Sequence, residues 1–541
     1  MKIASLLSFL FLVLVACNPK EEVDLIVYNA NIYTVDEGFS KASSMAIKDG
    51  KFVAISENGD LAERFAAKKQ VDVEGKTIVP GLIDAHCHFY GLGMNQRVVD
   101  LVGTKSYDEV MAKVLDFHEK NPSNVVLGRG WDQNDWEVKE FPSKAQLDEH
   151  FPDIPVVLER VDGHAYQVNQ KALDMAGITK ETEIAGGEIV RADDGNATGI
   201  LVDAPMGLVD AVLPKPTKEI QIKALQQADS ICLDYGLTTV HDAGLNRDVI
   251  ELIDNLQQGD ALQIRMYTMV SNTPENLDYF LNKGIIKTNK LNVRSVKVYG
   301  DGALGSRGAT LKEPYSDKEG HFGAMITPAD EMEALAQRIA DTDYQMNTHA
   351  IGDSANIVVL RAYEKALEGK SDRRWRIEHA QIVSPIDFDY FEKGIIPSVQ
   401  PTHATSDMYW AEDRIGEERM HGAYAFKTLL DKAGTVALGT DFPVEKVSPF
   451  LTFYAAVARK DLDDYPEGGF QMKDALSREE ALRGMTIWAA HSGFEENEKG
   501  SIEVGKVADF VILSDDIMMV AAEEIPNLQA EQVFLGGKRV K

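Results

Sequence analysis

Apolar runs recur through the centre of the chain, and the segments between the later runs have helical periodicity. The first run, residues 78–89, reads "IVPGLIDAHCHF". Further runs follow at residues 237–244, 262–270, 293–302, 344–353, 374–381, 394–404 and 435–443. Residues 327–343, 354–369 and 422–434 repeat apolar positions every three or four residues, as amphipathic helices do. Strands that alternate with helices in this number predict an α/β fold, the (β/α)8 or TIM barrel.

A doubly wound open sheet is the competing arrangement of alternating strands and helices. In that fold a glycine-rich phosphate-binding loop commonly follows the first strand. No such loop follows residues 78–89. The pattern therefore favours the barrel.

The two ends of the chain have a different pattern: short runs in which apolar and polar residues alternate, as is typical of strands in small sheets. Residues 23–78 contain several such runs, one pair of which is joined by the turn "KDGK". Residues 499–541 have the same character. We expect these two segments to form one small β-sandwich, with the barrel, residues 79–90 plus 237–498, inserted between them.

Residues 91–236 separate the first predicted barrel strand from the second, and this connection is much longer than a βα unit needs. It contains a helical segment at 106–120, strand-like runs and a predicted hairpin at 186–203. Because it leaves from the carboxyl end of a barrel strand, we expect an α/β insert that stands over the barrel mouth.

Residues 1–17 are expected to be a targeting segment outside the fold. Lys2 precedes an apolar stretch that is too short to span a membrane as a stable helix. The stretch ends in "LVAC", which resembles the lipobox of bacterial lipoproteins and predicts lipidation of Cys17. We expect an exported protein that this lipid alone holds at the periplasmic side of a membrane or at the cell surface. A cleaved signal peptide without lipid, or an uncleaved anchor, is the alternative.

The composition describes a globular protein and excludes one class of partner. Hydrophobic residues make up 44% of the chain and charged residues 26%, which suffices for a large core. Asp and Glu number 86 against 56 Lys and Arg, for a formal net charge of -30. This acidic balance argues against nucleic acid as a partner. We expect a small-molecule substrate, and a homo-oligomer stays open because oligomeric state is not readable from the sequence.

Polar residues within or at the ends of the apolar runs are the candidate chemistry. His86 and His88 are two residues apart on a strand, so their side chains share a face and can converge on one point. Hydrogen-bonded histidines at a strand end are the alternative interpretation. Active sites of barrels form where the strands end. The later runs bring four more polar residues to this region: Lys297, His349, His379 and Asp441.

These residue types suit one or two divalent metal ions. Zinc accepts neutral imidazole nitrogens and carboxylate oxygens, and manganese, iron and cobalt suit the same set. A buried lysine amine has a lowered pKa, and its neutral form can react with carbon dioxide to give an anionic carbamate. Lys297 is therefore a candidate bridge between two ions. An ion pair between Lys297 and Asp301 or Asp441 is the alternative.

Several motifs resemble the amidohydrolase superfamily, and more closely its YtcJ-like branch, known as amidohydrolase family 3. They are "VPGLIDAHCH", "GWDQ", "VDGHA", "KVYGDGALGSRGA", "THAIGD", "IEHAQ", "LGTDFPV" and the closing "GSIEVGKVADFVIL". The resemblance implies a bridging carbamate on Lys297, and Asp441 near both ions. It also implies histidine ligands for the more buried ion and for the second ion, respectively His86 with His88 and His349 with His379.

The activity implied by this resemblance is hydrolysis of a C–N bond in an amide, N-acyl or cyclic amide substrate by metal-activated water. Asp441 is the candidate proton shuttle, because it is both a ligand and a titratable group. Five other residues are candidates for substrate binding: His403, Arg307, His164, Trp131 and Asp132. The structural alternatives are a backbone hydrogen bond for a loop histidine, an ion pair with the acidic surface for the arginine, and packing between the insert and the barrel for the indole.

Two other functions stay as alternatives. A deaminase of the same fold would work with a single metal and would not need Lys297 as a ligand. A surface lipoprotein that binds without turnover would use the barrel only as a scaffold, although the complete ligand set argues against this. The exact substrate is not readable from the sequence.

Overall fold

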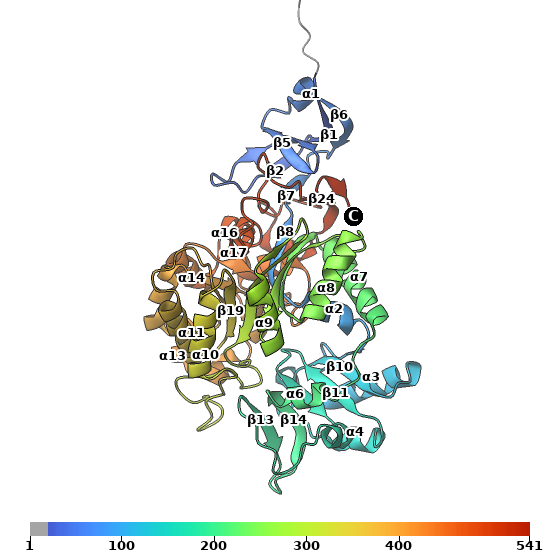
Figure 1. Ribbon diagram of the computed structural model, residues 1–541, viewed down its shortest axis with the longest axis vertical. Helices are drawn as coiled ribbons and strands as arrows, with labels where there is room; N and C mark the ends of the chain where they lie inside the picture. Colours follow the sequence, from blue (N-terminus) through green and yellow to red (C-terminus); the bar gives the residue numbers. More distant parts are fainter. Residues whose placement is uncertain (1–19) are drawn as a thin grey trace, which may run out of the picture.

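The computed structural model describes residues 20–541, so the predicted targeting segment with Cys17 lies outside the described residues. Its centre is a nearly closed barrel of parallel strands surrounded by helices (Figure 1). The barrel strands follow one another in chain order: β8 (Leu82–Cys87), β15 (Leu237–Leu245), β16 (Arg265–Ser271), β18 (Leu291–Tyr299), β19 (Gln345–Ala350), β20 (Arg376–His379), β21 (Ile396–Val399) and β22 (Ala437–Leu438). The predicted barrel is confirmed.

Alternation of side chains along these strands explains why polar residues lie inside apolar runs. In β18, Val296 and Val298 belong to the main hydrophobic cluster, which packs against the surrounding helices. Ser295 and Lys297 are equally buried but point the other way, toward the barrel axis. The interior of the barrel is therefore polar where its exterior is apolar.

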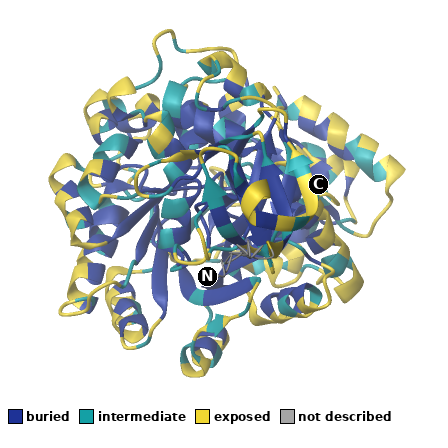
Figure 2. Ribbon diagram, turned by 90° about the horizontal axis from the view of Figure 1, so that it is seen from above, coloured by how far each residue is buried: buried dark blue, intermediate teal, exposed yellow. Residues whose placement is uncertain are grey.

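The helices around the barrel bury their inward faces and expose their outward faces (Figure 2). Their starts follow ordinary capping rules; for example, Thr273 caps α9 and Pro274 occupies its first position. These helices are α7 (Lys218–Asp234), α8 (Arg247–Gln258), α9 (Pro274–Lys283), α10 (Ala329–Ala340), α11 (Asp353–Ala366), α12 (Pro401–Asp407), α13 (Ala411–Arg419), α14 (Phe426–Ala433), α15 (Pro449–Ala458), α16 (Arg478–Gly484) and α17 (Ile487–Ser492).

The seam between the last barrel strand and the first is joined by loop and side-chain hydrogen bonds. The backbone N–H of Asp441 donates to the carbonyl of His86 at 2.8 Å. The Thr440 hydroxyl donates to Asp84 Oδ2 at 2.6 Å, and burial raises the pKa of Asp84 to about 7. The seam thus fixes His86 and Asp441, which come from opposite ends of the barrel sequence, beside each other.

Strands from both ends of the chain form two further sheets, at the top of Figure 1. Val27 and Ile47 of one sheet share a buried apolar cluster with Ile78 and Phe510 of the other. The first sheet has the order β5 (Lys51–Ser56), β4 (Ser44–Lys48), β1 (Glu21–Tyr28), β6 (Phe65–Asp72). The second has the order β25 (Lys538–Arg539), β24 (Ala530–Leu535), β23 (Phe510–Leu513), β7 (Thr77–Pro80), β2 (Asn31–Tyr33), β3 (Lys41–Ala42).

The long connection between β8 and β15 builds a sheet of its own, at the bottom of Figure 1. Its strand order is β13 (Gly187–Arg191), β14 (Ala197–Asp203), β12 (Ala165–Val168), β11 (Val156–Arg160), β10 (Val126–Trp131), β9 (Val99–Asp100). Besides α7, the α-helices of this connection are α2 (Phe89–Asn95), α3 (Tyr107–Lys120), α4 (Ala145–His150), α5 (Gln170–Met175) and α6 (Met206–Asp210).

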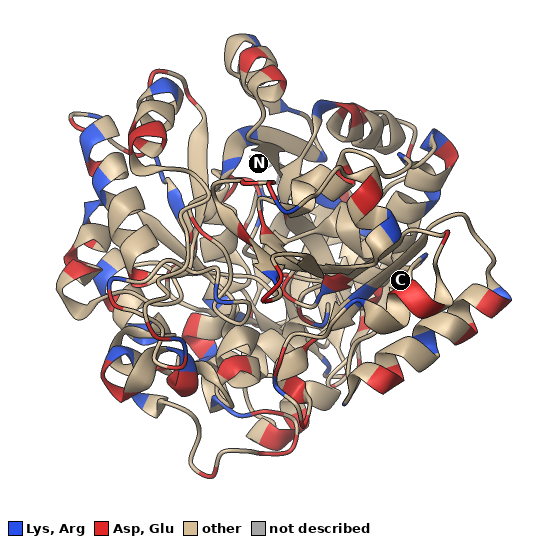
Figure 3. Cartoon of the chain, turned by 90° about the horizontal axis from the view of Figure 1, so that it is seen from below, with Lys and Arg blue, Asp and Glu red and all other residues tan. Residues whose placement is uncertain are grey.

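Residues of both charge signs are interspersed on the outer helices (Figure 3). None of the helices within residues 20–541 combines the length and the hydropathy that crossing a membrane requires.

Close packing of α2 against α7 carries the first testable prediction, because α2 begins directly after His88. A Cβ atom at Gly93 would lie 2.0 Å from the carbonyl oxygen of Ala224 in α7. We therefore expect Gly93→Ala to lower the free energy of unfolding by about 1–3 kcal/mol, as overpacking does. Denaturant unfolding measures this difference.

Gly207→Ala in α6 is the control for this substitution, since a Cβ there meets nothing within 4 Å. It should leave the stability unchanged or raise it by about 0.5–1 kcal/mol. Equal stabilities for the two variants would contradict the packing described for α2 and α7.

Candidate active site

Four histidines lie together where the barrel strands end. The ring centroids of His86 and His88 are 5.8 Å apart, and those of His86 and His379 are 4.8 Å apart. The ring of His349 lies 4.4 Å from that of His379. Three separate strands, β8, β19 and β20, therefore deliver imidazoles to one place.

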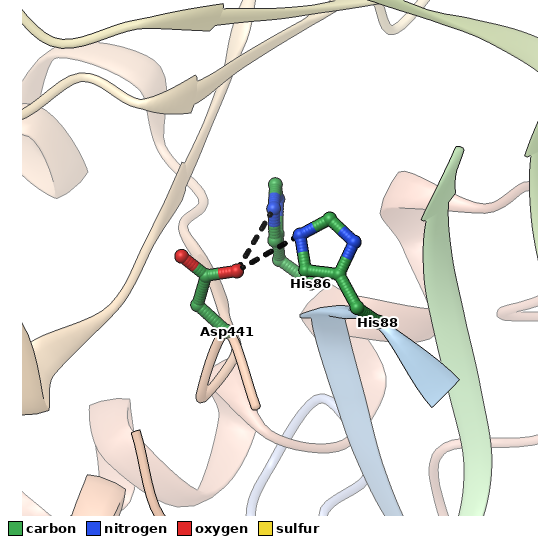
Figure 4. Close-up of side chains that lie close together, drawn as sticks. All are labelled: His86, His88 and Asp441. Atoms are coloured by element: carbon green, nitrogen blue, oxygen red, sulfur yellow. Dashed lines mark ion pairs between the residues drawn. The ribbon is translucent and has the colours of Figure 1, made fainter. Parts of the chain in front are cut away.

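Asp441 is the carboxylate at the centre of this arrangement (Figure 4). Its Oδ1 lies 3.5 Å from Nε2 of His86 and 3.3 Å from Nε2 of His88. Its Oδ2 lies 3.2 Å from Nε2 of His403. Two sets of donor atoms are close enough for one ion each, with atoms within 4.8 Å of one another: His86, His88 and Asp441, and His379, His403 and Asp441.

Two of these residues have a strained backbone. His379 has φ of 73° and Asp441 has φ of 61°, in the left-handed region that residues other than glycine rarely adopt. A conformation of this kind costs on the order of 1–3 kcal/mol and persists only where the surroundings determine it. The strand ends are therefore held in place against their local preference.

Burial favours the neutral imidazoles that metal binding requires. It lowers the pKa of His86 to about 4 and holds the pKa values of His349 and His379 well below the usual range. The pKa of Asp441 is well below its usual range, because the hydrogen bond from His403 and the closeness of the other imidazoles outweigh the effect of burial. The centre thus presents Asp441 and imidazole nitrogens in two neighbouring groups; His349, whose Nε2 lies 3.3 Å from the carbonyl of Gly302, belongs to neither group.

Hydrogen bonds behind the histidines set which ring nitrogen faces the centre. Nδ1 of His86 lies 2.5 Å from Oε2 of Glu378, and the Glu378 carboxylate also pairs with Arg376 at 2.7 Å. Nδ1 of His379 lies 2.7 Å from the amide oxygen of Gln400. With Nδ1 occupied in both rings, Nε2 is the nitrogen that remains for a ligand role.

Lys297 lies on the floor of the site. Its Nζ is 3.4 Å from Nε2 of His86, and burial lowers the pKa of the amine. Across residues 20–541, Lys297 forms no ion pair, with Asp301 and Asp441 included. Asp301 instead accepts backbone N–H groups from Thr310, Ile351 and Gly352. A neutral amine in this position is chemically able to form a carbamate.

A cavity of about 820 Å³ opens above the centre, and His403, His164 and Asp132 line it together with His88, His349 and His379. His164, from the connection between β8 and β15, lies 4.9 Å from His349 between ring centroids. Its Nδ1 is 2.6 Å from Oδ1 of Asp203. The predicted substrate-binding residues His403, His164 and Asp132 are thus brought to one cavity.

Two predicted substrate-binding residues are placed elsewhere. Trp131 is fully buried in the apolar core of its own segment, and its indole N–H donates to the carbonyl of Leu158 at 2.8 Å. Arg307 pairs with Asp317 at 2.8 Å and does not line the cavity. Arg307 follows its structural alternative, an ion pair, and Trp131 packs within its own segment instead of between the insert and the barrel; neither residue lines the cavity.

Sequence reasoning missed the residues that hold the ligands in place. Glu378 and Arg376 are two residues apart on β20, so they share a face, and this period was visible in "RIEH". The Asp203 carboxylate packs against Gly302. A Cβ at position 302 would lie 2.2 Å from Oδ2 of Asp203, so only glycine leaves room for this carboxylate. That contact joins segments far apart in the chain, and no local signal indicates it.

The pairing of Glu378 carries the second prediction. Glu378→Gln leaves the Arg376 charge buried without its partner and weakens the contact that orients His86. We expect the free energy of unfolding to fall by about 3–5 kcal/mol and the affinity for zinc to fall about 10- to 100-fold. Denaturant unfolding and chelator competition measure the two effects.

Glu333→Gln is the control for Glu378→Gln. Glu333 pairs with Lys365 on the surface, where loss of the pair costs at most about 1 kcal/mol. If Glu378→Gln bound zinc as tightly as Glu333→Gln, Glu378 would not orient a metal ligand.

Several known proteins are similar to this chain over most of its length. The Arabidopsis thaliana protein LONG AFTER FAR-RED 3 is 32% identical over 96% of this chain and 91% of its own length. N-substituted formamide deformylase of Arthrobacter pascens is 29% identical over 95% of this chain and 97% of its own length. The crystal structure of an uncharacterized metal-dependent hydrolase from Pyrococcus horikoshii superposes with a TM-score of 0.75 at 28% identity, covering 92% of this chain and 99% of that one.

YtcJ of Bacillus subtilis, whose name describes it as an amidohydrolase, is 30% identical over 94% of this chain and 98% of its own length. The sequence profile of the amidohydrolase family matches residues 69–541. The chain belongs to the amidohydrolase family.

Proposed function

We propose that this protein is a metal-dependent hydrolase that cleaves the C–N bond of an amide or N-acyl compound, with N-formyl compounds as the first class to test. The observation that carries this is the convergence of two imidazole nitrogens on Oδ1 of Asp441, at 3.5 Å and 3.3 Å. This oxygen is buried and accepts no hydrogen bond from the described residues. A buried carboxylate oxygen without a partner, flanked by two imidazole nitrogens, fits a cation.

The donor set suits two ions that share Asp441. His86 and His88 would hold the more buried ion, and His349 and His379 the second, with Lys297 as a carbamate between them. Zinc is the metal we propose, since it accepts neutral imidazole nitrogens and carboxylate oxygens. When bound, such an ion polarises a substrate carbonyl and makes water a better nucleophile.

Side chains of the protein would transfer the proton from the attacking water to the leaving nitrogen. Asp441 is placed to take a proton from the attacking water and to return it to the leaving nitrogen, so that the amide and one water give a carboxylic acid and an amine. His403 bridges Asp441 and Glu445, each at 3.2 Å, and the two carboxylates raise its pKa well above the usual range despite burial. A charged His403 would keep Asp441 oriented during this transfer.

His164 and Asp132 would position the substrate from the opposite wall. Asp203 fixes the His164 ring beside His349, and Asp132 is paired with Arg160 at the cavity surface. These residues belong to the connection between β8 and β15. We therefore propose that this connection, residues 91–236, is the insert that covers the barrel mouth and shapes the substrate pocket.

The substrate class is supported by one relative. N-substituted formamide deformylase of Arthrobacter pascens, which matches this chain over 95% of its length, is named for the removal of a formyl group from nitrogen. We propose the same bond type here. We also propose that the two sheets from the chain ends form a composite β-sandwich, and that lipidation of Cys17 anchors the exported enzyme at a membrane.

Removal of the shuttle carboxylate is the test of the mechanism. Asp441→Asn keeps a ligand oxygen but cannot take a proton, so we expect kcat to fall by about 10²- to 10⁴-fold while metal content falls only modestly. Turnover of an amide and N-formyl panel with added zinc, and metal analysis of the same samples, measure both quantities.

The surface variant Asp413→Asn controls for the change in charge, since Asp413 is exposed on α13. It should retain wild-type turnover. Wild-type turnover by Asp441→Asn would contradict the role given to this carboxylate.

Metal stoichiometry separates the amidase from the deaminase alternative. If Lys297 bridges two ions, Lys297→Ala should reduce bound zinc from two ions to one per chain, whereas the exposed-lysine control Lys365→Ala should not. Elemental analysis of purified protein gives the number. A wild-type protein with a single ion, retained fully by Lys297→Ala, would favour a mononuclear deaminase instead.

A further inference from the structure

The wall of the active-site cavity contains a carboxylate that the proposed mechanism does not use. Asp407 lies at the end of α12 and lines the cavity. Its Oδ2 accepts hydrogen bonds from the Tyr424 hydroxyl at 2.8 Å and from the Gln381 amide at 3.0 Å. In the part of the chain that the structure describes, its Oδ1 accepts no hydrogen bond and no side chain forms an ion pair with it.

The arginines that line the same cavity are committed to other carboxylates. Arg160 pairs with Asp162 at 2.5 Å and with Asp132, and its Nε donates to Gln133 at 2.8 Å. Arg129 pairs with Glu159 at 2.7 Å. The two arginines of the wall are thus neutralised locally, and Asp407 forms no ion pair among the described residues, although Lys446 and His403 also line the cavity.

An aromatic face lies in the same wall. Trp410 follows Asp407 by three residues, lines the cavity and is 93% buried, with 7% exposed. A Cβ at Gly305 would lie 3.3 Å from the Trp410 ring, so glycine there lets the barrel loop approach the indole closely. Indole is the aromatic group that attracts cations most strongly. The guanidinium of Arg414 lies 5.7 Å from the centroid of the Trp410 ring, but Arg414 is paired with Asp317 and does not line the cavity. A carboxylate and an indole in one wall are the usual partners of an organic cation.

The protonation of Asp407 agrees with this. Burial raises its pKa to about 7, although the nearby charge of His403 opposes the shift. A cation beside the carboxylate would favour its ionised form. The wall is also within reach of the reacting centre, because Gln381, which holds Asp407, is two residues beyond His379.

We propose that Asp407 and Trp410 form a subsite for a positively charged amine of the substrate. The preferred substrates are then amides or N-acyl compounds that carry an ammonium or guanidinium group a few atoms from the scissile bond. This inference rests on the proposed function for the bond that is cleaved. The subsite itself is a binding property, which can be measured without turnover.

The turnover test compares N-formyl-1,4-diaminobutane with N-formylpentylamine, which have the same chain length and differ in one ammonium group. Water adds to the formyl carbon, the C–N bond breaks, and formate and the free amine are released. We expect wild-type kcat/KM to be about 10- to 100-fold higher for the charged substrate. Asp407→Asn should lose this preference and keep the rate on the neutral substrate within about twofold, while the exposed-residue control Asp413→Asn should keep both.

The binding test uses the matched methanesulfonamides, which the enzyme cannot hydrolyse, titrated into zinc-loaded protein in a calorimeter. The ammonium compound should bind at least about 10-fold more tightly than the neutral one, and salt should weaken this difference. Trp410→Phe, which keeps an aromatic ring, should reduce the difference without abolishing it. This variant keeps the test decisive if Asp407→Asn does not fold.

The outcomes separate the subsite from the reaction. Charge-dependent binding without hydrolysis of any formamide would keep the subsite and overturn the proposed function. Equal binding of the charged and neutral compounds by wild-type protein would overturn the subsite. An equal loss of both substrates in Asp407→Asn would assign Asp407 a structural role and overturn it as well.

Discussion

The site depends on a buried carboxylate oxygen that faces two imidazole nitrogens and accepts no hydrogen bond from residues 20–541. Oδ1 of Asp441 is in this position between His86 and His88. A buried oxygen of this kind is costly in a protein that contains nothing else for it to bind. Burial at the same time lowers the pKa of His86 to about 4, so the neighbouring ring cannot readily supply a proton. A bound cation would satisfy the carboxylate oxygen and accept the lone pair of the neutral imidazole. The remaining features of the site hold this geometry in place.

The barrel supplies that geometry through its seam and through the polar face of its strands. The seam joins Asp441 to His86 by a backbone hydrogen bond, although the two residues are far apart in the sequence. Inside the barrel, Arg376 neutralises Glu378, and Glu378 in turn orients the His86 ring. Arg376, Glu378 and His86 are all buried, and a single charge at such a depth would be costly. Each of these contacts is therefore stable only in the presence of the next. A chain of this kind explains why the strand ends keep a strained backbone at His379 and Asp441.

Much of the architecture was predictable because it rests on short-range periodicity. A period of two along strands placed His86 and His88 on one face, and alternating apolar runs and helical segments predicted the barrel. Position along a strand end was enough to select His349, His379 and Asp441 as neighbours. Because barrel strands end at one rim, residues at the ends of separate apolar runs are predicted to lie near one another.

Side-chain roles outside the strand ends were less predictable, since they depend on contacts between distant segments. Trp131 and Asp132 are adjacent in the chain, yet the indole faces the core of its own sheet and the carboxylate faces the cavity. Arg307 follows a barrel strand, but it forms an ion pair with Asp317, ten residues later in the chain. Asp407 and Trp410 lie on loops and short helices beyond β21, where no period relates them to the histidines. Three-dimensional placement was needed for each of these.

The most direct test of the central claim is anomalous X-ray diffraction from crystals of the zinc-loaded protein, with data collected on both sides of the zinc absorption edge. The account predicts an anomalous peak about 2.0–2.2 Å from Nε2 of His86, Nε2 of His88 and Oδ1 of Asp441. A map with no peak at these three atoms, in protein that elemental analysis shows to contain zinc, would contradict it.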